Sequence, residues 1–566
     1  MGRGGAIEAR GLSYRYDPAE GLGLSPAEGY ALRDVDLTIA PGEYVLLCGA
    51  SGSGKSTLCR ALNGLVPHFH GGRLEGHLTV DGLETRDHPV AELFAHVGLV
   101  FQNPQAQLFN STVERELAFG LESLGLSPSE IRRRVRWAAQ VVGIEHLLER
   151  SPRQLSGGEE QLVAIGAILA LRPAILVLDE PFANLDPAGA ARVRAVLREI
   201  HRLGTTVVVA EHRLHDLVAD ADRMVVLHQG RVVLDGPPRQ VLREDVTRYG
   251  LNLPLSVRLF QEWGRPEVPL TVEEAMTLTP TPTPLPLPPQ SWGGPRGGGE
   301  GEGGWGVRVR GEGPALEARD LSFAFDGLLA LQGVSLTVGR GECVALVGAN
   351  GSGKTTLVKH FVGLHRPASG QVLVLGRSTR GVRVAELARQ VGLVFQNPND
   401  QFFAPSVREE IEVGPQALGL YDPTCCEELI ALFGMEPLLE RSPYRLSEGE
   451  KKRVTFAAVM AWRPEVIVLD EPTTGQDKPF RDGLTRLLGE LRARGHTVVL
   501  VTHDLEFAEA NAGRWIVLAG GRVVADGPPG AVMADEAAMA AANLRPTQAF
   551  QLARALGVPY GECVDG

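Results

Sequence analysis

The sequence predicts an α/β fold that is present twice: two domains, each with a mainly parallel sheet, a helical subdomain and a C-terminal helical extension. Three observations predict it. Apolar runs typical of buried strands, such as 44–48, 174–178 and 205–210, alternate with helical segments such as 187–203. A helical stretch from about 105 to 155 interrupts this alternation. The second half of the chain repeats the motifs of the first half in the same order.

Length and composition agree with two soluble domains. The chain has 566 residues, too many for one hydrophobic core, and is 44% hydrophobic and 22% charged. No apolar run approaches the ~18 residues that a membrane-spanning helix needs. The N-terminus has no apolar signal core, so we expect the chain to stay in the cytosol. The net charge of −12 argues against bulk binding of nucleic acid.

Two phosphate-binding loops, residues 49–57 and 348–356, each follow an apolar strand. In such a loop, backbone N–H groups surround the phosphates, the lysine reaches the outer two, and the next hydroxyl holds Mg²⁺. Glycine is needed because the backbone passes close to phosphate in conformations that other residues resist. The chain is therefore predicted to bind two nucleoside triphosphates. The expected ligands are Gly49, Ser51, Gly52, Ser53, Gly54, Lys55, Ser56, Thr57, Gly348, Asn350, Gly351, Ser352, Gly353, Lys354, Thr355 and Thr356.

The halves also agree in the spacing of their other motifs. Ser156 and Asp179 are 23 residues apart, as are Ser447 and Asp470. Such register across a whole domain indicates duplication. Between the halves, residues 279–289 are rich in proline, which favours an extended spacer, and residues 297–304 are rich in glycine, which favours a flexible coil.

The predicted boundaries follow from that composition. We expect a first domain at residues 1–270, a linker at 271–313 and a second domain at 314–566.

An Asp-Glu pair ends an apolar strand in each half. We expect Asp179 and Asp470 to hold Mg²⁺ directly or through water. The next residues, Glu180 and Glu471, are placed to polarise the attacking water as general bases. The alternative, a solvated acid pair, is disfavoured because both halves carry the pair at matching distances.

Histidine and glutamine residues follow other strands. A lone histidine at a strand end is more often structural, but His212 and His503 lie at the same offset in both halves, which favours contact with the γ-phosphate. Gln102 and Gln396 each offer a carbonyl to Mg²⁺ or water.

A serine and a glycine-rich turn, residues 155–159, precede a predicted helix at 160–171. Such a turn at a helix N-terminus is an anion site. Because each nucleotide already has its own loop, we expect this second anion site to close on the nucleotide held by the other domain.

The order of aromatic residue, phosphate loop, Gln loop, Leu-Ser-Gly-Gly signature, Asp-Glu pair and histidine resembles the ATP-binding-cassette (ABC) ATPases, twice over. In that family, two such domains form a head-to-tail sandwich with two ATP molecules at the interface. The resemblance implies a first site of Lys55, Ser56, Gln102, Asp179, Glu180 and His212 with Ser447 and Gly449. It implies a second site of Lys354, Thr355, Gln396, Asp470, Glu471 and His503 with Ser156, Gly157 and Gly158.

Further roles follow from the same resemblance. Tyr16 and Phe325 would stack on adenine, with Tyr14 as the alternative in the first half. Asp186 and Asp477 would communicate between the sites. The implied cofactors are ATP and Mg²⁺, with the metal held by Ser56, Gln102 and Asp179 in one site and by Thr355, Gln396 and Asp470 in the other.

Two positions depart from the family pattern. Glu448 replaces the first glycine of the second signature, and Leu162 stands where family members usually have arginine, which the second half keeps as Arg453. We expect both sites to hydrolyse ATP, but unequally.

The stretches 101–109 and 395–403 are similar to the Gln-loop region of energy-coupling-factor (ECF) ATPases, which power importers of vitamins and of cobalt or nickel. Further similar segments are 63–70, 113–120, 210–214, 252–264, 407–414 and 543–557. This resemblance implies a peripheral protein on the cytoplasmic face of the cell membrane. Its partners would be an integral-membrane coupling (T) subunit and a substrate-binding (S) subunit, with the two halves paired as an intramolecular pseudo-dimer and no nucleic acid bound.

Acidic residues near the Gln loops, Glu114, Glu116, Glu409 and Glu410, either pair with basic residues of the membrane subunit or form a solvated face. Other classes remain as alternatives. A tandem ATPase of a sugar-type importer is the nearer one. A soluble translation factor would need RNA contacts, and a DNA-repair protein would need coiled-coil or zinc insertions that the sequence does not show.

Other residues are expected to be structural. The six cysteines form no CxxC pair, and Cys48 and Cys343 occupy matched positions on buried strands, so we expect core thiols. His68 and His70 are interpreted as loop residues in preference to metal ligands.

Overall fold

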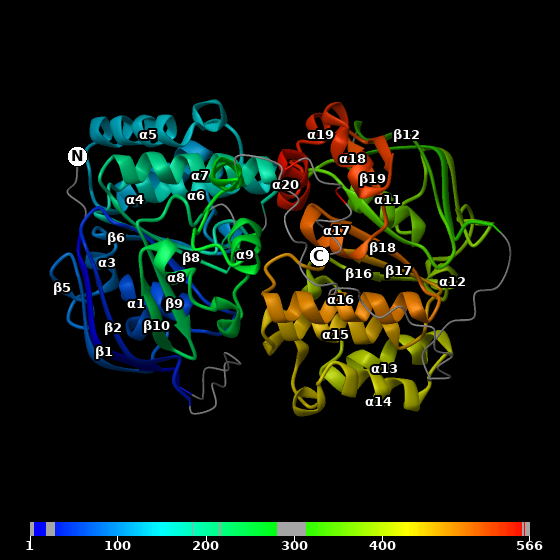
Figure 1. Ribbon diagram of the computed structural model, residues 1–566, viewed down its shortest axis with the longest axis horizontal. Coiled ribbons are helices and arrows are strands. Elements are labelled where there is room, and N and C mark those ends of the chain that lie inside the picture. Colours follow the sequence, from blue (N-terminus) through cyan, green and yellow to red (C-terminus); the bar gives the residue numbers. More distant parts are fainter. Residues whose placement is uncertain are drawn as a thin grey trace. The chain divides into compact units, whose positions relative to one another are not determined.

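The computed structural model describes residues 5–17, 29–183, 185–212, 214, 217–279, 313–325, 327–556 and 560. The chain divides into two compact units, Met1–Leu285 and Pro286–Gly566 (Figure 1). Each unit contains a six-stranded and a four-stranded sheet with helices, which confirms the predicted α/β class.

The first unit is built on a six-stranded sheet in the order β10-β9-β3-β8-β7-β6. Its neighbouring strands are parallel except for the β9–β10 pair. The strands are β3 (Tyr44–Cys48), β6 (Val97–Val100), β7 (Ile175–Asp179), β8 (Thr206–Glu211), β9 (Arg223–His228) and β10 (Arg231–Gly236). A four-stranded antiparallel sheet contains β1 (Ile7–Arg15), β2 (Leu32–Ile39), β4 (Arg73–Val80) and β5 (Leu83–Glu84).

Side-chain alternation along β3 divides the apolar residues between two cores. Leu46 packs in the core that includes the helical subdomain, whereas Val45 and Leu47 pack in the core that includes the four-stranded sheet. Because successive side chains of a strand point to opposite faces, one short strand serves both cores. A strand buried on both faces explains why its sequence is continuously apolar.

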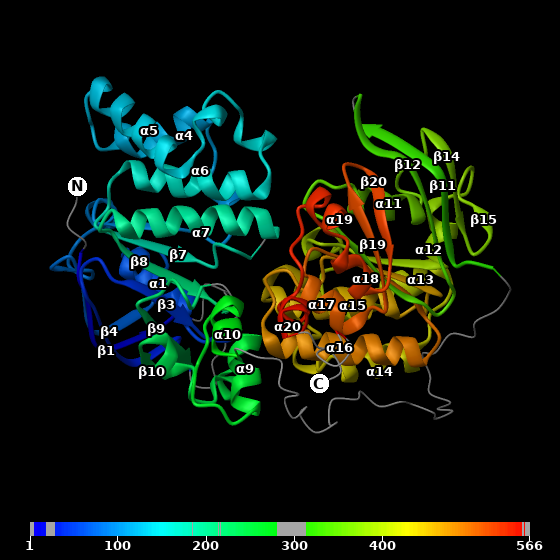
Figure 2. The same ribbon diagram turned by 45° about the horizontal axis from the view of Figure 1, so that its top comes forward.

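The predicted inserted helical subdomain is confirmed. Helices α4, α5 and α6 lie together, and α7 runs beside α6 (Figure 2). Ser127 caps α5 and Asp186 caps α7, each with proline as the first helical residue. The α-helices of the unit are α1 (Lys55–Leu62), α2 (Leu65–His68), α3 (Val90–Leu93), α4 (Val113–Ser123), α5 (Pro128–Val142), α6 (Gly157–Ala170), α7 (Pro187–Arg202), α8 (Pro238–Val241), α9 (Leu255–Glu262) and α10 (Val272–Leu278). Short 3₁₀ turns are η2 (Pro104–Ala106), η3 (Glu145–Leu147), η4 (Pro152–Gln154) and η5 (Val246–Tyr249).

The second unit repeats these sheets. Its six-stranded sheet has the order β20-β19-β13-β18-β17-β16, and its four-stranded sheet has the order β12-β11-β14-β15. The strands are β11 (Leu316–Phe325), β12 (Leu328–Val338), β13 (Cys343–Val347), β14 (Ser369–Val374), β15 (Arg377–Ser378), β16 (Val391–Val394), β17 (Val466–Asp470), β18 (Thr497–Thr502), β19 (Arg514–Ala519) and β20 (Arg522–Gly527).

Its helices follow the same plan, with α13, α14 and α15 as the helical subdomain. They are α11 (Lys354–Phe361), α12 (Val384–Ala388), α13 (Val407–Leu418), α14 (Pro423–Leu432), α15 (Glu448–Met460), α16 (Lys478–Ala493), α17 (Leu505–Asn511), α18 (Pro529–Ala534), α19 (Glu536–Ala541) and α20 (Gln548–Leu556). The 3₁₀ turns are η6 (Pro398–Asp400), η7 (Glu436–Leu438) and η8 (Pro443–Arg445).

Helix α10 lies inside the stretch that we expected to be linker. Thr271 caps it, and Val272 and Ala275 are buried on one face. An N-cap with apolar residues three apart is enough to define a short packed helix, so the first unit continues at least to Leu278. The proline-rich and glycine-rich parts of the expected linker lie outside the described residues, except for Thr279.

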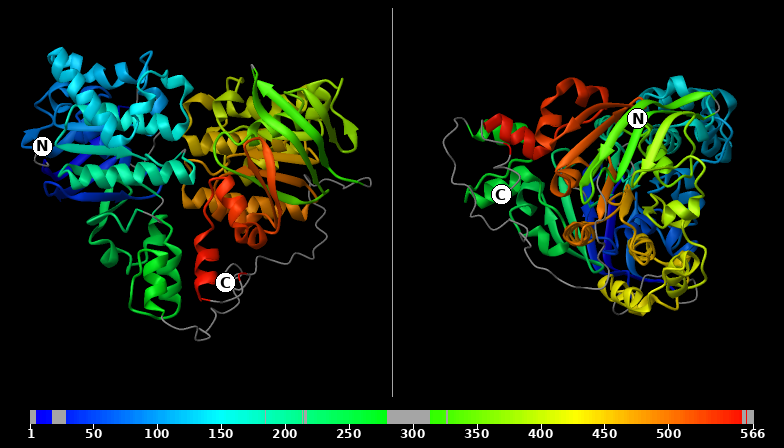
Figure 3. Two further views of the ribbon diagram at one scale, coloured as in Figure 1. Left: turned by 90° about the horizontal axis from the view of Figure 1, so that it is seen from above. Right: turned by 90° about the vertical axis from the view of Figure 1, so that its right-hand side faces the viewer.

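The predicted C-terminal extensions are helical in both units. Helix α9 buries Val257 and Phe260, and α20 places Phe550 in the core of the second unit. Figure 3 shows these helices, green in the first unit and red in the second.

In the described part of the chain, no helix is both long and apolar enough to span a membrane. The cysteines described, Cys48, Cys59, Cys343, Cys425 and Cys426, are all free and buried, which confirms Cys48 and Cys343 as core thiols; Cys563 lies outside the described residues.

Candidate nucleotide sites

Each phosphate loop connects a central strand to a helix, β3 to α1 and β13 to α11. The Nζ of Lys55 donates to the carbonyls of Gly49 and Ala50 at 2.7 and 3.0 Å. The Nζ of Lys354 donates to the matching carbonyls of Gly348 and Ala349 at 2.8 and 2.9 Å. Both lysines are buried. Each loop therefore folds around the ammonium group of its own lysine. A phosphate placed in the loop would lie within reach of that ammonium group.

Glycine is required at the start of the first loop. Gly49 has φ of 157°, and a Cβ there would lie 2.4 Å from the carbonyl oxygen of Leu227. The backbone therefore passes too close to β9 for any side chain.

A hydroxyl and a carboxylate meet beside each loop. Ser56 Oγ donates to Asp179 Oδ1 at 2.9 Å, and Thr355 Oγ1 donates to Asp470 Oδ1 at 3.3 Å. Burial raises the pKa of Asp179, and it raises the pKa of Asp470 to about 6. A cation at this place would favour the ionised form of each acid.

These donor sets fit Mg²⁺, which accepts few protein oxygens and completes its coordination with phosphate and water. Among the described residues, no group of three or more His, Cys, Asp or Glu side chains could hold a metal ion.

The glutamates that follow the aspartates have an unusual backbone. Glu180 and Glu471 both have φ of 48°, in the left-handed region. This conformation costs a non-glycine residue on the order of 1–2 kcal/mol, so the surroundings must hold it. The N–H of Glu180 donates to Ala210 and that of Glu471 to Val501, each at 2.9 Å, which ties both turns to the neighbouring strand.

In the first unit the predicted residues gather around the Glu180 carboxylate. Gln102 Nε2 donates to its Oε2 at 2.9 Å. Lys55 Nζ and His212 Nδ1 lie 3.9 and 3.6 Å from its Oε1. The structure thus brings together the phosphate loop, the Gln loop, the acid and the histidine.

In the second unit the grouping is smaller. Glu471 Oε1 lies 2.9 Å from His503 Nδ1, and Thr502 Oγ1 donates to Glu471 Oε2 at 3.4 Å. Burial opposes ionisation of Glu471, but the nearby charges of His503 and Lys354 hold its pKa below the usual value. Gln396 is exposed, and the described residues show no hydrogen bond between it and Glu471.

The aromatic positions before the loops differ in burial. The Tyr16 hydroxyl lies 3.3 Å from Thr57 Oγ1, beside the first phosphate loop, and the Phe325 ring is exposed at the end of β11. Tyr14 is fully buried, and its hydroxyl donates to the Gly71 carbonyl at 2.7 Å. The alternative that Tyr14 stacks on adenine is therefore wrong, because both faces of its ring are covered by the core.

The signature serines cap helices. Ser156 caps α6 and Ser447 caps α15, each in a capping box with the glutamate three residues later. Helix α6 therefore begins at Gly157, earlier than the predicted Glu160. Gly158 and Gly449 lie in the first turn of their helices. The Glu448 carboxylate accepts from Lys451 Nζ at 2.9 Å, which directs its charge along α15.

The residues Asp186 and Asp477 cap the helices that follow the acid pair. Their carboxylates accept from the backbone N–H groups of Gly189 and Phe480 at 2.7 and 3.2 Å.

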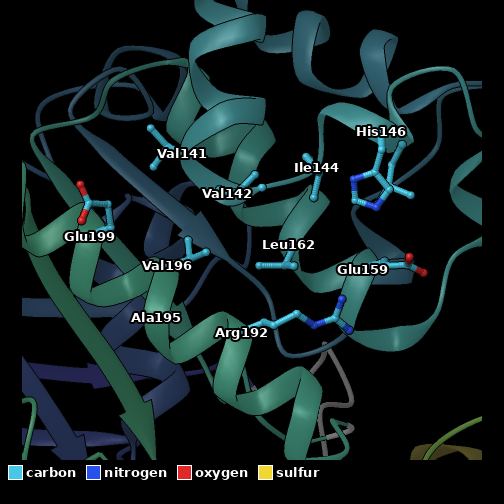
Figure 4. A pocket seen from close by; sticks show the side chains of 12 residues that line it. Val141, Val142, Ile144, His146, Glu159, Leu162, Arg192, Ala195, Val196 and Glu199 are labelled. Atoms are coloured by element: carbon cyan, nitrogen blue, oxygen red, sulfur yellow. The ribbon is translucent and has the colours of Figure 1, made fainter.

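A cavity lies beside Leu162, the residue of the first signature helix that stands where family members usually have arginine. Leu162 is buried and lines a space of about 310 Å³ between α5, α6 and α7, together with Val142, Val196 and Arg192 (Figure 4). In the second unit, Arg453 donates to the Phe433 carbonyl at 3.0 Å. Larger side chains occupy the second unit at matched positions, where Phe433, Phe456 and Phe480 stand for Val142, Ile165 and Gly189.

Two of the acidic residues near the Gln loops are neither partner contacts nor a solvated face. Glu116 is buried and accepts from the N–H groups of Phe109 and Asn110 at 3.0 and 2.7 Å. Glu410 is buried and accepts from Phe403 and Ala404 at 3.0 and 2.8 Å. Both interpretations were wrong for Glu116 and Glu410. Each carboxylate accepts hydrogen bonds from backbone N–H groups of a loop, which have no partner in a helix or a strand. Glu114 and Glu409 are exposed.

We expect E116A and E410A each to lower the free energy of unfolding by about 1–3 kcal/mol, because each leaves two N–H groups of a loop without an acceptor. Thermal unfolding of the full-length chain measures the change. E114A, at an exposed glutamate two residues from Glu116, is the control and should stay within about 0.5 kcal/mol. Equal stability of E116A and E114A would contradict this role.

Two buried residues beside the glutamates were not predicted. Glu211 ends β8, and its carboxylate accepts from the N–H groups of Phe182 and His212 at 3.2 and 3.1 Å. Lys452, on α15, donates from Nζ to the Glu471 carbonyl at 3.0 Å. Burial lowers the pKa of Lys452 to about 8, in spite of the nearby charges of Glu471, Glu448 and Asp470. A charged residue at the end of an apolar strand was the available signal for Glu211.

His68 is the last residue of α2, so its interpretation as a loop residue was wrong, whereas His70 follows that helix. His68 Nε2 lies 2.9 Å from the Thr85 carbonyl, and the His70 ring packs edge-on against Phe69.

Comparison with known proteins decides the family. Residues 32–183 and 331–474 match the family model described as ABC transporter. The chain belongs to the ABC transporter ATP-binding family. Its two units are thus ATPase domains that bind ATP, as the resemblance implied.

Several relatives match this ABC protein over most of its length, and they share the name "Putative ABC transporter ATP-binding protein". One from Caldanaerobacter subterraneus is 35% identical over 98% of this chain and 97% of its own. One from Methanosarcina acetivorans is 37% identical over 94% and 89%. One from Streptomyces avermitilis is 43% identical over 89% and 91%. The matches therefore extend over both units of this chain and over most of the length of each relative.

Among solved structures, cbiO1 from Clostridium perfringens, titled as part of the ABC transporter complex cbiONQ, is 32% identical. The match covers 45% of this ABC chain and 98% of that chain, with a TM-score of 0.38.

Proposed function

We propose that the chain is the ATP-hydrolysing subunit of an ECF-type importer, which takes up a vitamin or a transition-metal ion through separate membrane subunits. The observation that carries this proposal is an exposed aromatic residue after each Gln loop. Phe109 is 64% exposed and Phe403 is 69% exposed, at matched positions of two stretches that resemble the ECF pattern.

The exposure of these rings is built into the loops. Glu116 and Glu410 hold the backbone N–H groups of Phe109 and Phe403, so the loops are fixed while the rings face outwards. Phe109 also packs edge-on against Phe119, another exposed ring. Fixed aromatic residues on a surface are typical anchors of protein interfaces. They would bind the coupling subunit at the cytoplasmic face of the membrane, and a substrate-binding subunit would select the cargo.

Within each unit we assign chemical roles from the geometry. Glu180 and Glu471 polarise the attacking water, and His212 and His503, at 3.6 and 2.9 Å from them, orient these carboxylates and contact the γ-phosphate. Tyr16 and Phe325 stack on adenine. Gln102 links the Gln loop to Glu180, so movement of that loop by a partner would reach the acid.

Mg²⁺ would be held by Ser56 with Asp179 and by Thr355 with Asp470. When bound, it would neutralise charge that develops on the phosphates.

The test is a pull-down of the tagged chain from detergent-solubilised membranes of its own host, with identification of the proteins that co-purify. We expect one polytopic membrane protein and one small membrane protein, and we expect F109S with F403S to lose both because the aromatic anchors are gone. V384S, at an exposed apolar residue of α12, is the comparison and should retain most of the recovery.

Recovery of a sugar-type permease, of ribosomal proteins or of soluble proteins alone would overturn the ECF assignment. Equal recovery with F109S and F403S would overturn the proposed binding surface.

A further inference from the structure

We propose that Lys452 is a positioning residue for the catalytic glutamate of the second unit, and that the first unit positions its glutamate by a different contact. This inference rests on the proposed role of Glu471 as general base. It begins from a comparison of two turns that share the same left-handed φ of 48° but have different neighbours.

The contact of Lys452 is direct and buried. Its side chain belongs to α15, the helix that begins beside the signature Ser447, and Lys452 is 3% exposed. Its Nζ donates to the carbonyl oxygen of Glu471 at 3.0 Å. A charged donor makes a stronger hydrogen bond than a neutral one, and more so away from water.

The Glu471 carbonyl is the place where such a bond matters. A left-handed residue that is not glycine stays in that conformation only when its surroundings hold it. A hydrogen bond to the Glu471 carbonyl fixes the peptide group that follows Glu471. It thereby also fixes the direction of the Glu471 carboxylate, whose Oε1 lies 2.9 Å from His503 Nδ1. The side chain of Lys452 therefore links the signature helix to the carboxylate that activates water.

The first unit has no such link at the matched position. Gln161 stands there, is 2% exposed, and its Nε2 has no hydrogen-bond partner among the described residues. The turn after Glu180 is instead held from β8, because the Glu211 carboxylate accepts from the N–H groups of Phe182 and His212. The second unit has threonine at both matched positions, Thr502 for Glu211 and Thr473 for Phe182.

The two glutamates therefore respond to different parts of their units. A displacement of α15 reaches Glu471 through Lys452, whereas Glu180 is fixed to the central sheet by Glu211. Among the described residues, a direct side-chain hydrogen bond from the signature helix to the turn of the acid is present for Glu471, and α6 makes no such bond from Gln161 to the turn of Glu180.

The test compares K452M, K452R and the matched control Q161M in the full-length chain that also carries E180Q, whose remaining turnover belongs to the second unit. We expect K452M to lower kcat on the order of tenfold, as for a displaced catalytic group, with KM for ATP within twofold. K452R should restore most of the rate, and Q161M should change neither constant. If E180Q and E471Q each stop all turnover, the two sites act together, and the same fall is expected of K452M in the otherwise unaltered chain.

The proposal would be overturned by an unchanged kcat in K452M, or by a rise of KM in place of a fall in kcat. Failure of K452R to restore the rate would also overturn it. If K452M does not fold, as judged by thermal unfolding, K452Q, which copies the first unit, takes its place with the same expectation. E471Q is measured in parallel: if it keeps full turnover, the general-base assignment itself fails, which is a result separate from the behaviour of Lys452.

Discussion

Replacement of both glutamates, E180Q with E471Q, is expected to lower ATP turnover by roughly 10²–10⁴-fold, the contribution of a positioned general base. Glutamine keeps the size and hydrogen-bonding capacity of each side chain but cannot accept a proton from water. ATP binding should persist, because Lys55 and Lys354 and their loops are untouched. Phosphate release and binding of a labelled ATP analogue measure the two effects separately.

The single variants report on the inequality of the two sites. The acids differ in their surroundings: Gln102 contacts Glu180, whereas Glu471 lies against His503 and Lys452. We expect each single substitution to leave a measurable and different share of the turnover. Loss of all turnover in only one of the two would contradict hydrolysis at both sites. E122Q, at an exposed glutamate of α4, serves as the control.

Removal of one phosphate-loop lysine, in K55A or K354A, is expected to weaken ATP binding at that loop by roughly 10- to 100-fold. The estimate is the loss of a hydrogen bond to a charged group, worth about 1.5–3 kcal/mol. Each Nζ now donates to two carbonyls of its own loop, so the ammonium group is already in place for phosphate.

Because the chain carries two phosphate loops, the unaltered loop of each variant serves as its internal reference. Isothermal titration with a non-hydrolysable ATP analogue should show two sites in the unaltered chain and one of native affinity in each variant. Two sites of native affinity in K55A would show that Lys55 does not bind phosphate.

Much of the candidate site followed from residue type and spacing. The phosphate loops, the Asp-Glu pairs and the strand-end histidines could be identified because the chain repeats them in register, and the structure brings Lys55, Gln102, Glu180 and His212 together as expected. What spacing could not reveal was burial. Glu116 and Glu410 are acidic in a polar stretch, and only the folded loops show that backbone N–H groups surround them. The same holds for Tyr14, whose ring is covered by strands distant in sequence.

The class of fold, its duplication, the inserted helical subdomain and the candidate residues for ATP binding could be predicted from the sequence, because these depend on local periodicity, on turn chemistry and on short motifs. The tertiary structure alone decided which buried groups support the acids. Lys452 and Gln161 occupy one position of a repeated helix, and Glu211 and Thr502 one position of a repeated strand. Whether such a residue holds a catalytic turn depends on distances between segments far apart in the chain, which packing sets and which no local pattern encodes.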